Sequence, residues 1–251
     1  MIKPANRLFL LLCFVFALGC GESTSGSATP QAALPAQSAP TQPAPAENST
    51  SPSVDDVAPV AYVEGTHYER LPQPVPTADK DRIEVAEVFW YGCSHCYDFE
   101  PLVAAWSASL PADVALVKNP AMWDNQGIME THARIYYTAK VLGVEDRVSP
   151  AAFRALNIDH QPLRSEGDIA RLFTDNGVAL EDFERTFNSF GVTSSVRQAE
   201  SRQRSYRVQG TPELVVNGTY RISARMAGSQ GAMLKVADYL VAKIRSEKTE
   251  S

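Results

Sequence analysis

Two cysteines separated by two residues are the clearest candidates for chemistry in this chain. Cys93, Ser94, His95 and Cys96 follow the segment IEVAEVFWYG, whose β-branched and aromatic residues predict a buried strand. Apolar residues then recur at helical spacing from Phe99 onward. The pattern places Cys93 at the start of a helix, and a C-x-x-C at such a turn is typical of a thiol redox site.

The predicted position of Cys93 favours its reactive form. Unpaired backbone N–H groups and the helix dipole favour negative charge at a helix N-terminus, and the thiolate is the reactive species. We therefore expect Cys93 to be the exposed, acidic nucleophile and Cys96 to be the more buried, resolving cysteine. His95 can donate a hydrogen bond or a positive charge to the Cys93 thiolate. Stabilising this thiolate stabilises the dithiol form, which makes the disulfide a stronger oxidant.

The cysteine pair has two alternative roles. A C-x-x-C can be half of a zinc site, but such a site needs four ligands, and the sequence has no second C-x-x-C and no histidines at ligand spacing. A purely structural disulfide across two residues at a helix start is unusual. We expect no metal, and no cofactor beyond the redox-active disulfide Cys93–Cys96.

Glu87 stands in the predicted strand, six residues before Cys93. A carboxylate in a buried strand conflicts with the local pattern, and such conflicts tend to mark functional sites. We expect burial to raise the pKa of Glu87, and its carboxylate to accept the proton of the buried Cys96 thiol, directly or through water. The alternative is that Glu87 faces solvent. Glu84, nearer the strand start, is expected to be exposed.

Residues 1–20, MIKPANRLFLLLCFVFALGC, predict a lipoprotein signal peptide. Two basic residues precede the apolar core Leu8–Leu18, which is too short for a comfortable membrane span. The ending Ala-Leu-Gly-Cys resembles a bacterial lipobox, so Cys20 is predicted to carry the lipid. Ala17 replaces the usual lipobox leucine, and cleavage of an ordinary secretory signal is the alternative.

Residues 21–60 are predicted to form a disordered linker. They contain seven of the 17 prolines, abundant Ser, Ala and Thr, and no Lys or Arg. Such a segment cannot bury enough apolar surface to offset its ordering entropy. The linker would hold the folded part away from a membrane. Gly21, in place of the Asp that often marks inner-membrane retention, favours the outer membrane.

Composition limits the class of partner. The formal net charge is −6 and no basic stripe is present, which argues against nucleic acid as a partner. Once the signal peptide is removed and Cys20 is lipidated, Cys93 and Cys96 remain for thiol chemistry. The protein is thus expected to enter an oxidising compartment without a structural disulfide framework.

The folded part is expected to be α/β and to consist of three segments. Residues 61–125 contain the strand and helix around the cysteines, followed by a second predicted strand at Asp113–Lys118. Apolar residues then take a helical period over 126–203, which predicts an all-helical insertion. In residues 204–251, β-signals resume from Ser205 and a final helix closes the chain.

The last segment also contains a predicted hairpin. Leu214–Val216 and Tyr220–Ile222 are β-prone and flank Asn217-Gly218, the dipeptide that type I′ turns prefer. Pro212 lies just before the hairpin, and a proline there belongs at a strand start or in a specialised bend.

Together these features resemble the DsbA-type thiol:disulfide oxidoreductases. The resemblance rests on the CSHC motif after the EVFWYG strand, the helical insertion, and the tripeptide Gly-Thr-Pro before an Asn-Gly hairpin, and it covers about 62–246. It implies a thioredoxin fold with an inserted all-helical domain, in a protein of the bacterial periplasm.

The resemblance also assigns roles to particular residues. It implies a cis Pro212 beside the active-site disulfide, with Gly210, Thr211 and Ser94 bordering an extended substrate peptide, and it gives Glu87 the position of the family's buried acid. Two residues depart from the usual pattern. Ser94 replaces a proline, and Thr211 replaces the typical valine and resembles the isomerases and reductases of the same compartment.

The leading hypothesis is an oxidase that donates its Cys93–Cys96 disulfide to unfolded or reduced exported proteins. Its partners would be those substrates, a DsbB-type membrane protein that reoxidises it, and a membrane reached through the lipid anchor. We expect a monomer. The alternatives are a periplasmic reductase or isomerase of the same fold, and a non-catalytic, lipid-anchored binding module whose cysteines are incidental.

Overall fold

The computed structural model describes residues 62–123 and 127–249. The predicted signal peptide 1–20, the lipidation site Cys20 and the predicted linker 21–60 lie outside the described residues. Among the helices of the described part, none is both long and apolar enough to cross a membrane.

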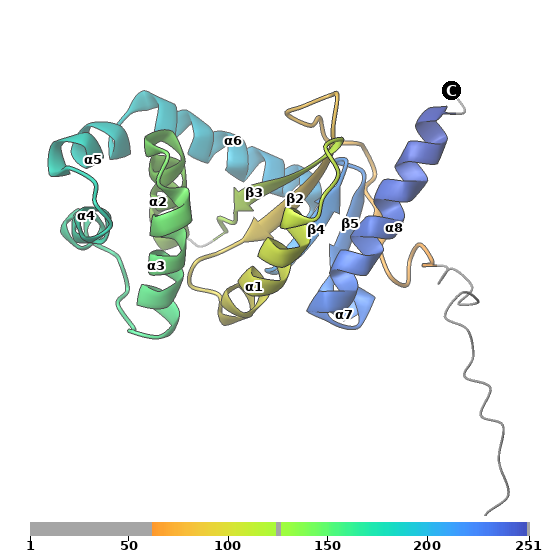
Figure 1. Cartoon of the computed structure of the whole chain (residues 1–251), viewed down its shortest axis with the longest axis horizontal. Coiled ribbons are helices and arrows are strands. Elements are labelled where there is room, and N and C mark those ends of the chain that lie inside the picture. The colour runs from red at the N-terminus through yellow and green to blue at the C-terminus, as the bar shows by residue number, and fades with distance from the viewer. Residues whose placement is uncertain (1–61, 124–126, 250–251) are drawn as a thin grey trace, which may run out of the picture. The chain divides into compact units, whose positions relative to one another are not determined.

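Five strands form one mixed sheet in the order β1-β5-β4-β2-β3 (Figure 1). The central strand β2 (Ile83–Phe89) pairs in parallel with β3 (Val114–Pro120) and antiparallel with β4 (Glu213–Val216). β5 (Tyr220–Ser223) continues from β4 and pairs with the short β1 (Glu69–Arg70). Every residue of β2 is buried, including the two glutamates that interrupt its apolar residues.

The hairpin between β4 and β5 has the predicted turn. Asn217 and Gly218 have φ values of 50° and 58°, and the Thr219 N–H donates to the Val216 carbonyl at 2.9 Å. Positive φ at both central residues is what a type I′ turn requires. A Cβ on Gly218 would lie 1.9 Å from the Val75 carbonyl oxygen, so glycine is needed for space as well as for backbone conformation.

Helices cover both faces of the sheet. α1 (Ser94–Ala108) and α8 (Gln230–Thr249) contact each other, and α8 lies against β4 and β5, with the short α7 (Ala224–Ala227) leading into it (Figure 1). Their shared core with the sheet includes Val85, Phe99, Val103, Leu214, Val216, Ile222, Met233, Val236 and Leu240. This layer fixes the start of α1, and therefore the cysteines, at the end of the central strand.

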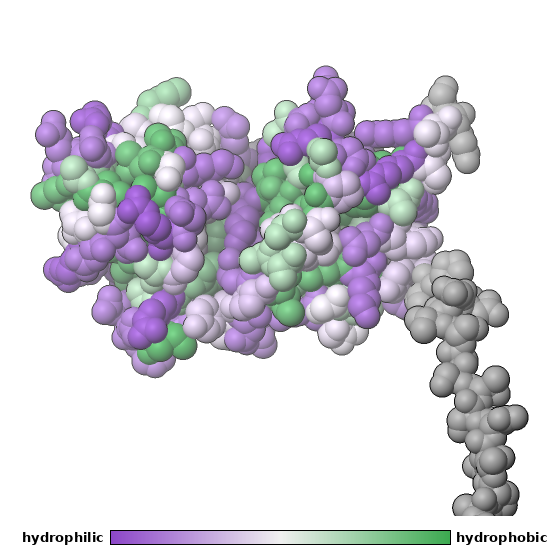
Figure 2. Space-filling view, in the orientation of Figure 1, coloured by the Kyte–Doolittle hydropathy of each residue, from purple (hydrophilic) through white to green (hydrophobic). Residues whose placement is uncertain are grey.

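An all-helical insertion lies between β3 and β4, as predicted. It comprises α2 (Ile128–Leu142), α3 (Glu145–Asn157), α4 (Glu166–Asp175), α5 (Leu180–Phe187) and α6 (Phe190–Tyr206). Its aromatic residues fill a core that also includes Cys96, as expected for core packing. The fold is thus the predicted thioredoxin-like α/β arrangement with a helical insertion. Hydrophilic residues cover most of the molecular face that Figure 2 shows.

The strands that follow the helical insertion begin later in the chain than the sequence pattern predicts. Helix α6 continues to Tyr206, and β4 begins only at Glu213, whereas β-signals were expected from Ser205. The buried faces of Val192, Val196 and Tyr206 join α6 to the second face of the sheet. Packing on the sheet therefore extends the helix past residues that have strand-like local preferences.

The expectation that Glu84 is exposed is wrong. Glu84 is only 1% exposed, because it lies in a strand covered on both faces. Its carboxylate accepts hydrogen bonds from the Ala78 N–H at 3.1 Å and from the Tyr206 hydroxyl at 3.4 Å, and it lies 3.8 Å from the Arg202 guanidinium. Partners distant in sequence thus compensate for its burial.

Candidate active site

The two cysteines lie where β2 runs into α1. Cys93 is the N-cap of α1, and its carbonyl accepts hydrogen bonds from the N–H groups of Cys96 and Tyr97, each at 3.0 Å. Cys93 is partly exposed, whereas Cys96 is fully buried, and both are free thiols. This matches the expected division between an accessible and a buried cysteine.

Hydrogen bonds stabilise the thiolate of Cys93. The Cys96 thiol donates to the Cys93 sulfur and, against the effect of partial burial, lowers the pKa of Cys93 to about 5. The Thr211 hydroxyl and the backbone N–H groups of Cys96 and His95 add to this lowering. The unpaired N–H groups of a helix start thus face the sulfur, as predicted. The thiolate is consequently the main form of Cys93 at neutral pH.

Cys96 has the opposite tendency. Burial raises the pKa of its thiol well above the usual range, and the neighbouring Cys93 raises it further. The pair therefore combines a thiolate at the surface with a protonated thiol beneath it. Because the proton of Cys96 is shared towards the Cys93 sulfur, the dithiol form is stabilised relative to the disulfide.

Glu87 is buried in β2, and its side chain is 0% exposed. Burial raises the pKa of Glu87, although the Lys118 ammonium at 3.6 Å acts in the opposite direction. Neither carboxylate oxygen accepts a hydrogen bond from the described residues. Glu87 therefore does not face solvent, and its carboxyl group titrates at higher pH than an ordinary glutamate.

Lys118 and Glu100 complete this buried charged group, and sequence reasoning missed both. Lys118 lies directly opposite Glu87 in the parallel β2–β3 pair, and its ammonium donates to both carboxylate oxygens of Glu100, at 2.5 and 2.6 Å. Although burial lowers the pKa of Lys118, the carboxylates of Glu87 and Glu100 raise it above its usual range. A lysine directly after the apolar run Val114–Val117 was the available signal.

The peptide bond between Thr211 and Pro212 is cis, as the family resemblance implies. The backbone of Thr211 lies beside the nucleophile: its carbonyl oxygen is 3.4 Å from the Cys93 sulfur and accepts a hydrogen bond from Cys93 when this thiol is protonated. The chain thus joins two segments 118 residues apart at the reactive sulfur. Gly210 lies next to Thr211 at the same cleft.

Ser94 and His95 are exposed at the first turn of α1. The backbone of His95 acts at the site: its N–H lowers the pKa of Cys93, and its carbonyl accepts a hydrogen bond from Nε2 of Gln230 at 2.6 Å. Gln230 thereby ties the start of α8 to the active-site turn. The predicted role of the His95 imidazole stays a prediction.

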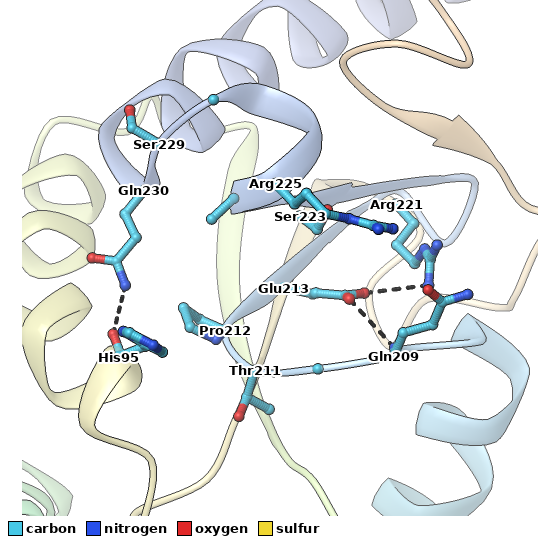
Figure 3. A pocket seen from close by; sticks show the side chains of 13 residues that line it. His95, Gln209, Thr211, Pro212, Glu213, Arg221, Ser223, Arg225, Ser229 and Gln230 are labelled. Carbon is cyan, nitrogen blue, oxygen red and sulfur yellow. Dashed lines mark hydrogen bonds and ion pairs between the residues drawn. The ribbon is translucent and has the colours of Figure 1, made fainter.

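A cleft of about 600 Å³ opens beside the cysteine motif (Figure 3). It runs between the cis-proline loop, the end of β5 and the start of α8. Its lining is mostly polar and includes His95, Gln209, Thr211, Glu213, Arg221, Ser223, Arg225, Ser229 and Gln230. An extended polypeptide next to Cys93 would meet this surface. Within 62–123 and 127–249, no group of three His, Cys, Asp or Glu side chains is arranged to hold a metal ion.

Comparisons with known proteins agree with this geometry. Residues 123–235 match the family described as DSBA-like thioredoxin domain. The chain is 40% identical over 185 residues to the thiol:disulfide interchange protein DsbA of Pseudomonas aeruginosa, covering 74% of this chain and 87% of that protein. It is 36% identical over 192 residues to DsbA of Azotobacter vinelandii, covering 76% and 89% of the two chains.

A solved structure shows the same similarity in three dimensions. The crystal structure of Pseudomonas aeruginosa DsbA superposes with a TM-score of 0.72 at 40% identity, covering 75% of this chain and 97% of that one. The similarity therefore spans the sheet, the cysteine motif and the helical insertion together.

Proposed function

This chain belongs to the DsbA family of thiol:disulfide interchange proteins, and we propose how its residues carry out the exchange, where it acts and with which partners. The protein is a thiol:disulfide oxidoreductase whose redox group is the Cys93–Cys96 pair itself. The observation that carries the proposal is the contrast between the two thiols. A Cys93 pKa of about 5 beside a buried, protonated Cys96 favours the dithiol form and makes the disulfide oxidising.

The exchange begins when a substrate thiolate attacks the sulfur of Cys93. The Cys93–Cys96 bond breaks, the substrate becomes joined to Cys93 by a mixed disulfide, and Cys96 leaves as a thiolate. A second substrate thiolate then attacks the substrate sulfur of the mixed disulfide and releases Cys93 as a stable thiolate. The substrate is oxidised by two electrons and the enzyme is reduced by two.

Glu87 supplies and accepts the proton of Cys96. Its raised pKa keeps a fraction of the carboxyl group protonated near neutral pH, so it can donate a proton to the departing Cys96 thiolate. In reoxidation it accepts the proton of the Cys96 thiol. Lys118 and Glu100 hold the carboxyl group of Glu87 in place. Because Glu100 is partly exposed, it links this buried group to the protein surface.

The cis-proline loop positions the substrate. The Thr211 backbone, 3.4 Å from the Cys93 sulfur, would pair with an extended substrate segment, with Gly210 and Ser94 at its borders. The Thr211 hydroxyl also stabilises the Cys93 thiolate, so threonine here favours the oxidase over the reductase or isomerase. His95 would reinforce the thiolate when its imidazole is charged.

We place the protein in the bacterial periplasm, attached to a membrane through a lipid on Cys20. The signal-like residues 1–20 and the Ala-Leu-Gly-Cys ending support this location, and Gly21 favours the outer membrane. Residues 21–60 would act as a tether between the anchor and the folded segments 61–125, 126–203 and 204–251. The substrates are reduced exported proteins, a DsbB-type membrane protein reoxidises the pair, and the protein acts as a monomer.

Trapping tests the exchange. In a Cys96→Ser variant a mixed disulfide at Cys93 cannot be resolved by the enzyme, so covalent complexes with periplasmic proteins should accumulate on non-reducing gels. The matched Cys93→Ser variant should form none. Equal amounts of complex in the two variants would contradict the assignment of Cys93 as the nucleophile.

Fractionation tests the anchor. The full chain should sediment with membranes and carry the mass of a diacylglycerol group, whereas Cys20→Ser should lose both. A wild-type protein released in soluble form after cleavage would reject the lipid anchor and leave the exchange reaction untouched.

A further inference from the structure

The turn that precedes Cys93 contains a peptide unit that the hydrogen bond of the turn does not fix. The Cys93 N–H donates to the Trp90 carbonyl oxygen at 3.0 Å, which closes a β-turn with Tyr91 and Gly92 at its centre. The peptide between the two central residues of a β-turn can take two nearly opposite orientations, those of the type I and type II forms. Type II needs a positive φ at the third residue, which glycine adopts without strain. Gly92 therefore permits both orientations, and its φ in this structure is not positive.

Asn157, from the helical insertion, holds this central peptide. It is the last residue of α3 and is partly exposed. Its Nδ2 donates to the Tyr91 carbonyl oxygen and to the Phe153 carbonyl oxygen, each at 2.8 Å. A side-chain amide has two N–H donors, and these two acceptors use both of them. In the type II orientation the Tyr91 carbonyl would point the opposite way and lose its donor, so Asn157 favours the observed form of the turn.

The side chains on both sides of this peptide have partners of their own. Nε1 of the Trp90 indole donates to Nδ1 of His132 in α2 at 3.0 Å. The Tyr91 hydroxyl shares a hydrogen bond of 2.6 Å with the Ser149 hydroxyl in α3. These contacts hold the side chains of the turn but not its central carbonyl group. A reversal of the peptide would therefore be confined to the backbone next to the nucleophile.

We propose that Asn157 is a positioning residue: by holding the turn before Cys93 in one orientation, it keeps the Cys93 sulfur among the donors that stabilise its thiolate. The inference rests on disulfide exchange at Cys93. Those donors are the Cys96 thiol, the Thr211 hydroxyl and the N–H groups of Cys96 and His95. Reversing the peptide before Cys93 changes the direction in which its side chain leaves the backbone. The sulfur then lies away from these donors for part of the time, which makes the disulfide less oxidising.

Titration of the reduced protein tests the proposal. Asn157→Leu removes the amide group but keeps a side chain of similar size. The pKa of Cys93, followed by thiolate absorbance at about 240 nm, should rise from about 5 by about half a unit to one unit, the range expected for part of one hydrogen bond to a charged group. In glutathione buffers, the equilibrium constant for oxidation of glutathione by the variant should fall about threefold to tenfold.

Asn176→Leu provides the matched control. Asn176 stands at the end of α4, and its Nδ2 donates to the Leu172 carbonyl oxygen at 2.8 Å, the same bond to the residue four positions earlier that Asn157 makes in α3. This variant should leave the Cys93 pKa and the glutathione equilibrium unchanged. In NMR spectra the amide signal of Gly92 should shift, split or broaden in Asn157→Leu and stay as in the wild type in Asn176→Leu.

Three results would overturn the proposal. They are an equal Cys93 pKa in the wild type and Asn157→Leu, an equal rise in the two asparagine variants, and an unaltered Gly92 signal in Asn157→Leu. A wild-type Cys93 that titrates near 9.0 would instead reject the acidic nucleophile of the proposed function, and with it this inference.

Discussion

The ammonium nitrogen of Lys118 lies 3.6 Å from a carboxylate oxygen of Glu87, directly across two parallel strands. This pair places a positive charge beside a carboxyl group that burial would otherwise keep protonated. The distance is too long for a strong hydrogen bond, and the ammonium group donates to Glu100 instead. The carboxyl group of Glu87 is therefore left able to gain or lose a proton within the buried strand.

Replacing Glu87 with Gln should stabilise the reduced protein at high pH. The folded-state pKa of Glu87 is raised above its unfolded value of 4.5, so the folded state binds its proton more tightly. Ionisation therefore costs stability as the pH rises above 4.5 and through the folded-state pKa. The variant should gain on the order of 1–3 kcal/mol in urea unfolding at pH 8 and almost nothing at pH 4.

Glu84→Gln provides the matched control in the same strand. Glu84 is also buried, but its oxygens already accept hydrogen bonds from Ala78 and Tyr206. This variant should give no stabilisation at pH 8. A similar gain in stability in both variants would show that loss of any buried carboxylate stabilises the protein, and that the effect is not specific to Glu87.

The stability difference between reduced and oxidised protein should increase with pH. The pKa of Cys93 is lowered from 9.0 to about 5, so the thiolate stabilises the folded dithiol form. That stabilisation is complete above the unfolded pKa and is lost as the pH falls through the folded one. In thermal unfolding from pH 4 to 9, the Tm of the reduced form should rise relative to the Tm of the oxidised form from about pH 5 upward. An unchanging difference across this range would contradict an acidic Cys93.

Thr211→Val should raise the pKa of Cys93. The variant removes the hydroxyl that donates to the thiolate but keeps the branched shape and the backbone carbonyl. One hydrogen bond to a charged group corresponds to a pKa rise of about 1 unit. Thiolate absorbance at about 240 nm, followed against pH, measures the change. Thr211→Ser retains the hydroxyl and should titrate like the wild type, so a matching rise in both variants would refute the role of the hydroxyl.

Gly92→Ala should destabilise the turn before Cys93. An added Cβ would lie 2.5 Å from Cζ2 of the Trp90 indole. The indole cannot easily move, because its Nε1 donates to Nδ1 of His132 at 3.0 Å. We expect a loss of about 1–3 kcal/mol in chemical unfolding. Gly231→Ala, in α8 with open space around it, should instead be neutral or stabilising. Equal effects of the two substitutions would argue against the steric cause.

Local sequence signals predicted much of the fold and part of the site. The β-branched and aromatic residues of β2, the C-x-x-C after it and the Asn217-Gly218 turn each have local preferences that the structure follows. The cis Pro212 came from the resemblance, since a Thr-Pro pair alone does not distinguish cis from trans.

The remaining site features depend on contacts between distant segments. Lys118 lies opposite Glu87 because of the register between the parallel strands β2 and β3. The strand sequences alone do not specify this register. Glu84 was expected to be exposed because it lies near the strand start, and the partner that compensates for its burial, Tyr206, lies 122 residues away in the sequence. The ion pair between Glu213 and Arg221 likewise depends on the pairing of β4 with β5.

The equilibrium reduction potential of the Cys93–Cys96 pair is the most direct test of the central claim. The purified protein is equilibrated in glutathione buffers of graded composition, and the fraction reduced is followed by intrinsic fluorescence or alkylation. A stable Cys93 thiolate predicts a potential well above that of the glutathione couple, with a reduced form more stable than the oxidised one. A potential near that of thioredoxin, about −270 mV, would contradict the oxidase and favour a reductase.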